Sequence, residues 1–120
     1  MYEIRGGFIY RDDGDGCLAG KYVNISSQPF GETAKRRPAR PEDTRPFCGV
    51  YNTVWLETSN GTITNIPAIL TIDYDPNIQK YDLRWNSDPN NPNTPNSLRL
   101  LYEGVGMLYG DLLVGGYWSV

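Results

Sequence analysis

Few residues of this 120-residue chain are suited to chemistry, and histidine is missing altogether. Without histidine the chain lacks the commonest general base, the usual serine–histidine and cysteine–histidine nucleophile systems, and the ligand found in most zinc and copper sites. Cys17 and Cys48 are too few and too far apart in the sequence for a metal knuckle. We therefore expect neither a metal nor a cofactor.

Carboxylates are the remaining candidates for catalysis. Glu57 with Asp82, or Glu3 with Asp13, could serve as general acid and base if the fold brought either pair together. Cys48 could serve as a nucleophile only if a basic group other than histidine lowered its pKa. Nothing in the spacing of these residues separates them from surface charges. We therefore favour a protein without enzymatic activity and keep an enzyme as the third hypothesis.

An acidic, glycine-rich segment, Asp12-Asp13-Gly14-Asp15-Gly16, has the composition of a calcium loop. The spacing of an EF-hand fails, because a frame with its glycine at Gly16 places Arg11 at the first ligand position and Tyr22 at the last. Asp and Gly also tolerate the left-handed backbone of a tight turn. We expect a hairpin turn here and keep a cation site of another kind as the alternative.

The overall charge and the amino-terminal sequence bear on partners and location. Eleven basic and fourteen acidic residues give a net charge of −3, which argues against nucleic acid as the main partner. No apolar run is long enough to span a bilayer, and Met1 is followed directly by Tyr-Glu-Ile-Arg rather than by a signal peptide. We expect a cytoplasmic protein that does not enter a membrane and whose two cysteines are reduced, with a Cys17–Cys48 disulfide as the alternative.

The elements that must position these residues are strands, and the clearest pattern lies in the last quarter of the chain. Residues 97–120 alternate with period two around a turn at Tyr109-Gly110-Asp111, which predicts two strands with one buried face. Glycines alternate with large residues on that face, as in a tightly curved sheet. The positions expected to face inward are Leu98, Leu100, Tyr102, Gly104, Gly106, Leu108, Leu112, Val114, Gly116 and Trp118.

The opposite face of this hairpin is too apolar for a solvated surface. Exposed apolar patches of this kind usually mark an interface, so we expect the protein to form a homo-oligomer through it. The expected interface residues are Leu101, Val105, Met107, Leu113 and Tyr117.

Five further segments have the composition of strands, at 2–10, 17–26, 47–58, 63–74 and 78–86. The turns between them include Asn60-Gly61, which is typical of a tight hairpin. Pro67 predicts an edge or a bulge within its strand.

Two stretches without a period separate these strands. The segment 27–46 holds four prolines and the cluster Lys35-Arg36-Arg37, which predicts a long basic loop, and 87–96 predicts a Pro/Asn-rich connection. No segment has a 3.6-residue apolar period, so we expect almost no helix. About seven or eight strands in an antiparallel up-and-down meander predict an all-β domain over residues 1–120 that closes into a small barrel, with a β-sandwich as the alternative.

Two short segments resemble strands of the avidin-type barrels, within the lipocalin-like (calycin) group. Gly20-Lys21-Tyr22-Val23-Asn24 is similar to the family's Gly-x-Trp-x-Asn strand, and Phe47-Cys48-Gly49-Val50-Tyr51-Asn52-Thr53 is similar to its Phe-x-Gly-x-Tyr strand. The resemblance implies a closed barrel with a binding site at one mouth.

The resemblance also implies roles for single residues. Asn24, Ser27 and Tyr51 would stand where that family binds the ureido oxygen of biotin, and Trp85 would stand near a stacking tryptophan. Two positions depart from the family, because Arg99 stands where a second stacking tryptophan is expected and Tyr117 stands where a ureido-binding aspartate is expected. We therefore expect shared architecture rather than biotin binding.

The function expected from these patterns is a non-enzymatic binding barrel for a small molecule or peptide. A structural protein that assembles through its apolar outer face is the alternative. The expected ligand-binding residues are Asn24, Ser27, Tyr51, Asn52, Tyr81, Trp85 and Arg99.

Overall fold

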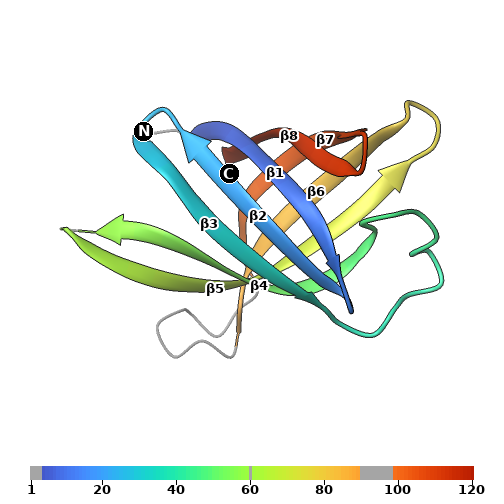
Figure 1. Cartoon of the computed structure of the whole chain (residues 1–120), viewed down its shortest axis with the longest axis horizontal. Helices are drawn as coiled ribbons and strands as arrows, with labels where there is room; N and C mark the ends of the chain where they lie inside the picture. The colour runs from blue at the N-terminus through green and yellow to red at the C-terminus, as the bar shows by residue number, and fades with distance from the viewer. Residues whose placement is uncertain (1–3, 60, 90–98) are drawn as a thin grey trace.

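The computed structural model describes residues 4–59, 61–89 and 99–120 and contains eight strands and no helix in these ranges (Figure 1). No helix in the described part of the chain is therefore long and apolar enough to cross a membrane. The strands are β1 (Arg5–Gly14), β2 (Cys17–Asn24), β3 (Ser27–Arg36), β4 (Gly49–Ser59), β5 (Thr62–Asp75), β6 (Lys80–Ser87), β7 (Leu100–Tyr109) and β8 (Leu112–Ser119).

The eight strands form a closed antiparallel barrel in chain order, and β1 closes it by pairing with β8. The predicted meander and barrel are confirmed, and the β-sandwich alternative is wrong. Closure leaves β1 and β8 without free edges along their shared ladder, which removes the sites where an open sheet would aggregate.

The barrel interior is filled by the faces that the period-two patterns predict for β2, β5 and β6. Leu18 and Tyr22 point inward from β2, and alternate residues of β5 and β6 are buried in the same way. The largest side chains with almost no exposed surface are Tyr10, Tyr51, Leu70, Ile72, Leu83 and Leu113.

The orientation predicted for the closing hairpin is correct for the middle of β7 and wrong for β8, and Leu108 at the end of β7 is 42% exposed. In β7 the even positions Gly104 and Gly106 are buried as predicted, but in β8 the odd positions Leu113 and Tyr117 are buried, with Leu113 0% exposed. The reason lies in the two-residue turn, because the register pairs an even residue with an odd one, as in Leu108 with Leu113. Cross-strand partners share a face of the sheet. The inward-facing residues are therefore even-numbered in β7 and odd-numbered in β8.

The prediction of a loop over 27–46 is wrong for its first half, because β3 occupies Ser27–Arg36. Pro29 fits into β3 because the ladder with β2 shifts register next to it and β4 pairs with β3 only from Glu32 onward. The sequence of β3 does not show apolar alternation with period two, because its inward positions include Glu32 and the partly buried Arg36. An apolar period is not visible where charged residues occupy the inner face.

The second predicted connection, 87–96, lies mostly outside the described residues. Ser87 belongs to β6 and is buried, and its backbone nitrogen donates a hydrogen bond to the carbonyl oxygen of Arg99 at 2.7 Å. The strand pairing of β5 with β6 begins at Ala68, so Pro67 lies where β5 pairs with β4 alone. This agrees with the prediction of an edge position for Pro67.

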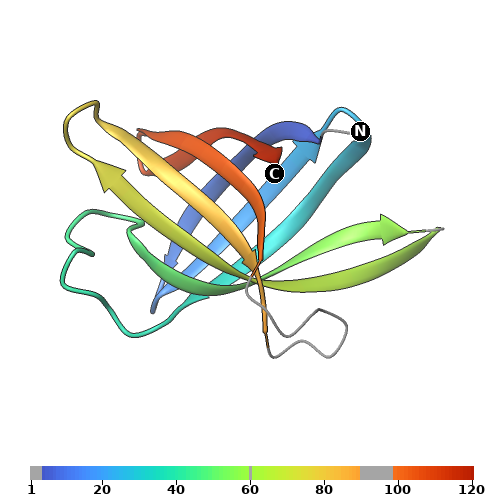
Figure 2. The ribbon, with the colours of Figure 1, turned by 180° about the vertical axis from the view of Figure 1, so that it is seen from behind.

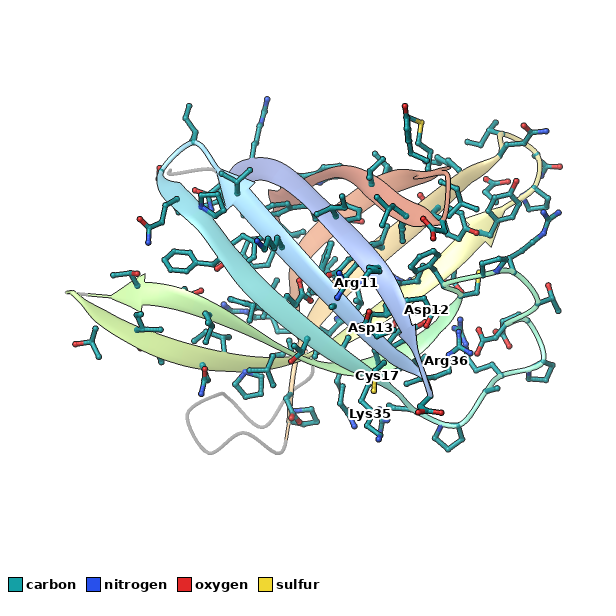
Figure 3. All side chains as sticks on the ribbon, viewed as in Figure 1. Arg11, Asp12, Asp13, Cys17, Lys35 and Arg36 are labelled. Atoms are coloured by element: carbon teal, nitrogen blue, oxygen red, sulfur yellow. The ribbon has the colours of Figure 1, made fainter. Side chains whose placement is uncertain are left out.

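One end of the barrel is plugged by the segment between β3 and β4. Phe47 and Cys48 are buried there, and the hydroxyl groups of Tyr51 and Tyr81 donate hydrogen bonds to the carbonyl oxygens of Phe47 and Pro46, each at 2.8 Å. Figure 3 shows Arg36 at this end, next to the connecting segment. Its Nη2 donates to the carbonyl oxygen of Cys48 at 2.6 Å.

The other end of the barrel is open between β3 and β4. These strands pair only from Glu32 with Trp55 to Arg36 with Tyr51, and beyond Trp55 strand β4 pairs with β5 alone. The β4–β5 hairpin therefore extends away from the barrel body, as both views of the ribbon show (Figures 1 and 2). The divergence of β3 and β4 gives this end of the barrel a mouth.

Candidate functional site

A cavity of about 510 Å³ lies at the open end, within the volume range typical of small-molecule sites. Every strand except β5 contributes to it. Its lining residues are Ile4, Phe8, Tyr22, Asn24, Ser26, Ser27, Gln28, Phe30, Glu32, Trp55, Glu57, Thr58, Trp85, Tyr102 and Tyr117.

Aromatic rings form most of the cavity wall and stand at steep angles to one another. Tyr102 contacts both Trp55 and Tyr117 edge to face, with ring centroids 5.9 and 5.7 Å apart. Tyr117 also contacts Trp85 at 6.1 Å and Tyr22 at 6.2 Å. Such contacts stabilise a fixed arrangement of rings, so the wall is shaped before any ligand enters.

These rings fit inside a small barrel because glycine lies opposite them. A Cβ atom at Gly104 would lie 3.0 Å from the Trp85 ring, and one at Gly106 would lie 3.2 Å from the Phe8 ring. The glycines of β7 therefore leave the space that the large side chains of the wall occupy.

A buried carboxyl group lies in the wall of this cavity. Glu32 is only 5% exposed, and Trp85 Nε1 donates a hydrogen bond to its Oε2 at 3.1 Å. Thr53 Oγ1 lies 2.6 Å from the same oxygen and 3.1 Å from the carbonyl oxygen of Thr33. The single proton of the Thr53 hydroxyl can serve only one of these acceptors at a time. In the described part of the chain, no ion pair includes Glu32.

Burial raises the pKa of Glu32 above its usual value, while hydrogen bonds from Thr53 and Trp85 oppose the rise. A protonated Glu32 can donate to Thr53, which then donates to Thr33, so the neutral form satisfies the whole chain of hydrogen bonds. The buried Tyr10 hydroxyl lies close to this carboxyl and also opposes the rise in its pKa, although no described group stands in hydrogen-bond geometry to that hydroxyl. Burial and the charge of Glu32 both raise the pKa of Tyr10.

The rim of the cavity carries the remaining polar groups. Glu57 accepts a hydrogen bond from Trp55 Nε1 at 2.9 Å, and Asn24 Nδ2 donates to the Tyr117 hydroxyl at 3.1 Å. The Ser27 hydroxyl is buried without a hydrogen-bond partner in the described ranges. The charged residues of the described lining are Glu32 and Glu57, and neither Lys nor Arg lines the cavity.

The structure brings together three of the seven residues predicted to bind a ligand. Asn24, Ser27 and Trp85 line the cavity, as the resemblance to avidin-type barrels implies for them.

The other four predicted ligand-binding residues lie elsewhere. Tyr51 and Tyr81 help to hold the plug at the opposite end of the barrel, while Asn52 and Arg99 are exposed. Asn52 occupies an outward position of β4, where the odd-numbered residues Tyr51, Thr53 and Trp55 are buried. Arg99 lies just before β7 and is not part of that strand.

The predicted interface residues are divided between the two faces of the barrel. Met107 is 61% exposed and Val105 is partly buried, while Leu101 is partly buried and packs against the core. The expectation that Leu113 and Tyr117 face outward is wrong, because Leu113 belongs to the core and Tyr117 lines the cavity.

Sequence reasoning missed Glu32, the residue that most distinguishes this cavity. The alternating series Phe30, Glu32, Ala34 and Arg36 carries the signal, but only if a charged residue is allowed on an inner face. Tyr22, Trp55 and Tyr102 were expected to lie on strands but were not assigned to a site. Phe30 was expected in the basic loop, and Tyr117 was expected at an interface.

Among the residues considered for catalysis, those that the structure describes do not assemble into an acid–base or nucleophile system. Glu57 lies on the projecting hairpin, whereas Asp82 lies near the plugged end and pairs with Lys80 at 3.1 Å. Glu3 lies outside the described residues. Cys17 and Cys48 are free thiols, as expected, and burial raises the pKa of Cys48, which is opposite to what a thiolate nucleophile needs.

The acidic segment next to β1 forms the predicted hairpin turn. Asp12 accepts a hydrogen bond from the backbone nitrogen of Gly14 at 2.9 Å, and Asp13 pairs with Arg11 at 2.6 Å. Figure 3 shows Arg11, Asp12 and Asp13 on β1 beside the turn. Within the described ranges, no group of three or more His, Cys, Asp or Glu side chains is placed to hold a metal ion.

Comparison of the chain with protein-family models, with curated proteins and with solved structures finds no match. What the structure shares with the expected family is the architecture, an eight-stranded antiparallel closed barrel. The kind of ligand that suits the cavity can therefore be inferred only from the residues that line it.

Proposed function

We propose that this protein is a non-enzymatic binding barrel of the lipocalin-like or avidin-like type, which takes a small molecule into the cavity at its open end. The observation that carries this proposal is the cavity of about 510 Å³, walled by aromatic rings and containing a buried carboxyl group. In a barrel of eight strands, side chains alone are able to fill the interior. Here the interior is filled and plugged at one end and hollow at the other, which favours a ligand site over simple core packing.

A small molecule suits this cavity better than a folded partner does. Ligand pockets are typically apolar with a few placed polar groups, and this cavity combines seven aromatic side chains with two carboxyl groups, Asn24 and serine hydroxyls. A ligand would bury its surface against rings that are already fixed by edge-to-face contacts, so binding requires little rearrangement of the protein.

Titration with Nile red, a neutral apolar dye that fluoresces in dry sites, tests the proposal. We expect saturable binding of one dye per chain. Ser27→Trp places a large ring at the mouth and should weaken binding at least tenfold, whereas Thr33→Trp, on the outer face of the same strand, should leave it unchanged. Dye binding that does not saturate, or that is equal in both variants, would show that the cavity is not a ligand site.

A second proposed role is self-association, favoured by an apolar strip on the outer face of β1, β7 and β8. Met107 pairs with Val114 across β7–β8, and Val114 pairs with Ile9 across β8–β1, so the three side chains are neighbours. Met107 and Ile9 are both exposed, and Val105 adjoins them along β7. We name Ile9, Val105, Met107 and Val114 the outer strip. Burial of the outer strip against a second copy of the chain would remove this apolar surface from water.

A further inference from the structure

Glu32 is a buried carboxyl group that has no positively charged side chain beside it among the described residues. Buried carboxylates in proteins are normally paired with a cation or bound to a metal. Two donors, Thr53 and Trp85, already reach Glu32 Oε2, so the surroundings are prepared to stabilise a negative charge. The component that this arrangement lacks is a positive charge, and the cavity beside Glu32 has the room to receive one.

The rest of the cavity also favours a positively charged ligand. Glu57 is the second charged residue of the described lining, and no basic side chain lines it. Aromatic rings attract cations through the negative potential of their faces, an effect that grows when the cation is desolvated. The Tyr102 ring contacts the rings of Trp55 and Tyr117 at interplanar angles of 80° and 79°, so rings of different orientation line one space. Alkylated ammonium groups are recognised by rings arranged around them in this way.

Resting on the proposed function, we infer that the ligand of this barrel is an organic cation, with a quaternary or alkylated ammonium group carried on an apolar body. The ammonium group lies among the rings of Trp55, Trp85, Tyr102 and Tyr117 and pairs with the carboxylate of Glu32. The apolar body extends toward Phe30 and Ile4 at the mouth.

Binding of such a cation is coupled to the protonation of Glu32. In the empty barrel, burial raises the pKa of this carboxyl, and a cation lowers it because it stabilises the charged form. The other ionisable groups that act on Glu32 are Tyr10 from β1, Tyr22 from β2 and Tyr117 from β8. Burial raises the pKa of all three, so they stay neutral below pH 8. Affinity for the cation therefore rises with pH as Glu32 loses its proton and levels off above the pKa of the empty site.

The test compares two ligands of the same shape by isothermal titration calorimetry. Benzyltrimethylammonium carries the charge, and neopentylbenzene replaces the nitrogen with carbon. A merely apolar cavity would prefer the neutral compound, because a cation loses its hydration on entry. We expect the wild-type protein to bind the cation at least tenfold more tightly at pH 8. At pH values near or below the raised pKa of Glu32 in the empty site, binding should also release protons, which is measured in buffers of different ionisation enthalpy.

Two matched variants test whether the preference for the cation depends on the charge of Glu32. Glu32→Gln preserves the shape of the side chain and removes its charge, and should lower the affinity for the cation about tenfold and abolish the pH dependence of binding. Glu42→Gln makes the same chemical change on an exposed side chain of the plug and should change nothing. Circular dichroism and Nile red binding establish that each variant is folded.

The outcomes separate this inference from the proposed function. Equal or tighter binding of neopentylbenzene by the wild-type protein overturns the inference of a cationic ligand, and this result needs no variant to fold. If Nile red binds but Glu32→Gln leaves the affinity for the cation unchanged, the barrel binds ligands and the role of Glu32 is wrong. If neither Nile red nor either compound binds, the proposed function fails as well.

Discussion

Glu32 shows how one residue couples the chemistry of the site to the stability of the fold. Its burial costs free energy when it is ionised, and its hydrogen bonds to Thr53 and Trp85 recover only part of that cost. A binding group that is strained in the empty protein is a common feature of functional sites, where stability is given up for affinity.

The raised pKa of Glu32 predicts that the free energy of unfolding falls as pH rises from the unfolded pKa of this carboxyl to its higher folded pKa. Between the unfolded pKa of about 4.3 and the higher folded value, the folded state binds more protons than the unfolded state. The free energy of unfolding therefore decreases with pH in this window and levels off above the folded pKa. The total decrease is about 1.4 kcal/mol for each unit by which the two pKa values differ. Urea denaturation at several pH values measures it.

Glu32→Gln should flatten this pH dependence and raise stability at pH 8 relative to the wild-type protein. Glu42→Gln should keep the slope of the wild-type protein, because Glu42 is exposed. A wild-type slope of the opposite sign between pH 5 and 8 would contradict the assignment of Glu32 as a buried carboxyl with a raised pKa.

At the scale of elements, the segment between β3 and β4 acts as a plug that an arginine fastens to the barrel. Arg40 Nη2 lies 2.7 Å from Asp43 Oδ1 and 2.8 Å from Asp73 Oδ1, so it joins the plug to β5. The side chain of Asp43 is 1% exposed. Burial opposes the ionisation of Asp43, but hydrogen bonds from Arg40 hold its pKa below the usual value.

Arg40→Met should therefore destabilise the protein by about 1–3 kcal/mol, because it leaves the buried Asp43 without its positive partner. Arg37→Met makes the same change at a neighbouring exposed side chain without a partner in the described ranges and should alter the free energy of unfolding by less than about 0.5 kcal/mol. Urea denaturation at pH 7 compares the two. Equal effects would show that the plug is not held by Arg40.

The β7–β8 hairpin lies against β1 only because glycine occupies its inner positions. A Cβ atom at Gly115 would lie 2.0 Å from the carbonyl oxygen of Val105 and 2.8 Å from the Phe8 ring. Gly115→Ala should therefore cost about 3 kcal/mol through displaced backbone, or prevent folding. Gly31 has no atom within 4 Å of the same position, and Gly31→Ala should be neutral within about 0.5 kcal/mol.

Thermal melts followed by circular dichroism measure both glycine variants. A Gly115→Ala protein as stable as the wild type would contradict the close packing of β7 against β8.

At the scale of the whole molecule, closure of the barrel divides the apolar surface into an inside and an outside. The inside is the core and the cavity, and the outside includes the outer strip of Ile9, Val105, Met107 and Val114. Of the interface residues predicted from the sequence, Val105 and Met107 face outward, while Leu113 and Tyr117 do not.

We predict that the protein forms a homo-oligomer through the outer strip. Met107→Lys places a charge at the centre of the strip and should shift the protein to a monomer in light scattering at micromolar concentration, because an unpaired charge in an apolar interface is costly. Thr33→Lys adds the same charge on an exposed position of β3 and should leave the mass unchanged. A wild-type protein that is monomeric at high concentration would show that the outer strip is not an interface.

The all-β class, the up-and-down order of the strands and part of the inward faces follow from the sequence alone. Period-two alternation is a local property, and β2, β5 and β6 show it plainly because their inner positions are apolar or glycine. The absence of histidine, which limits the chemistry, can also be read from the chain alone.

Only the tertiary structure decided which end of the barrel is open and which charge lies inside it. Glu32 is buried because Thr53 and Trp85, from two other strands, supply its hydrogen bonds. Tyr117 moves from the outside to the cavity because the register of a two-residue turn reverses the parity of β8. Both outcomes depend on partners across the barrel, and no pattern of apolar residues along one strand contains that information.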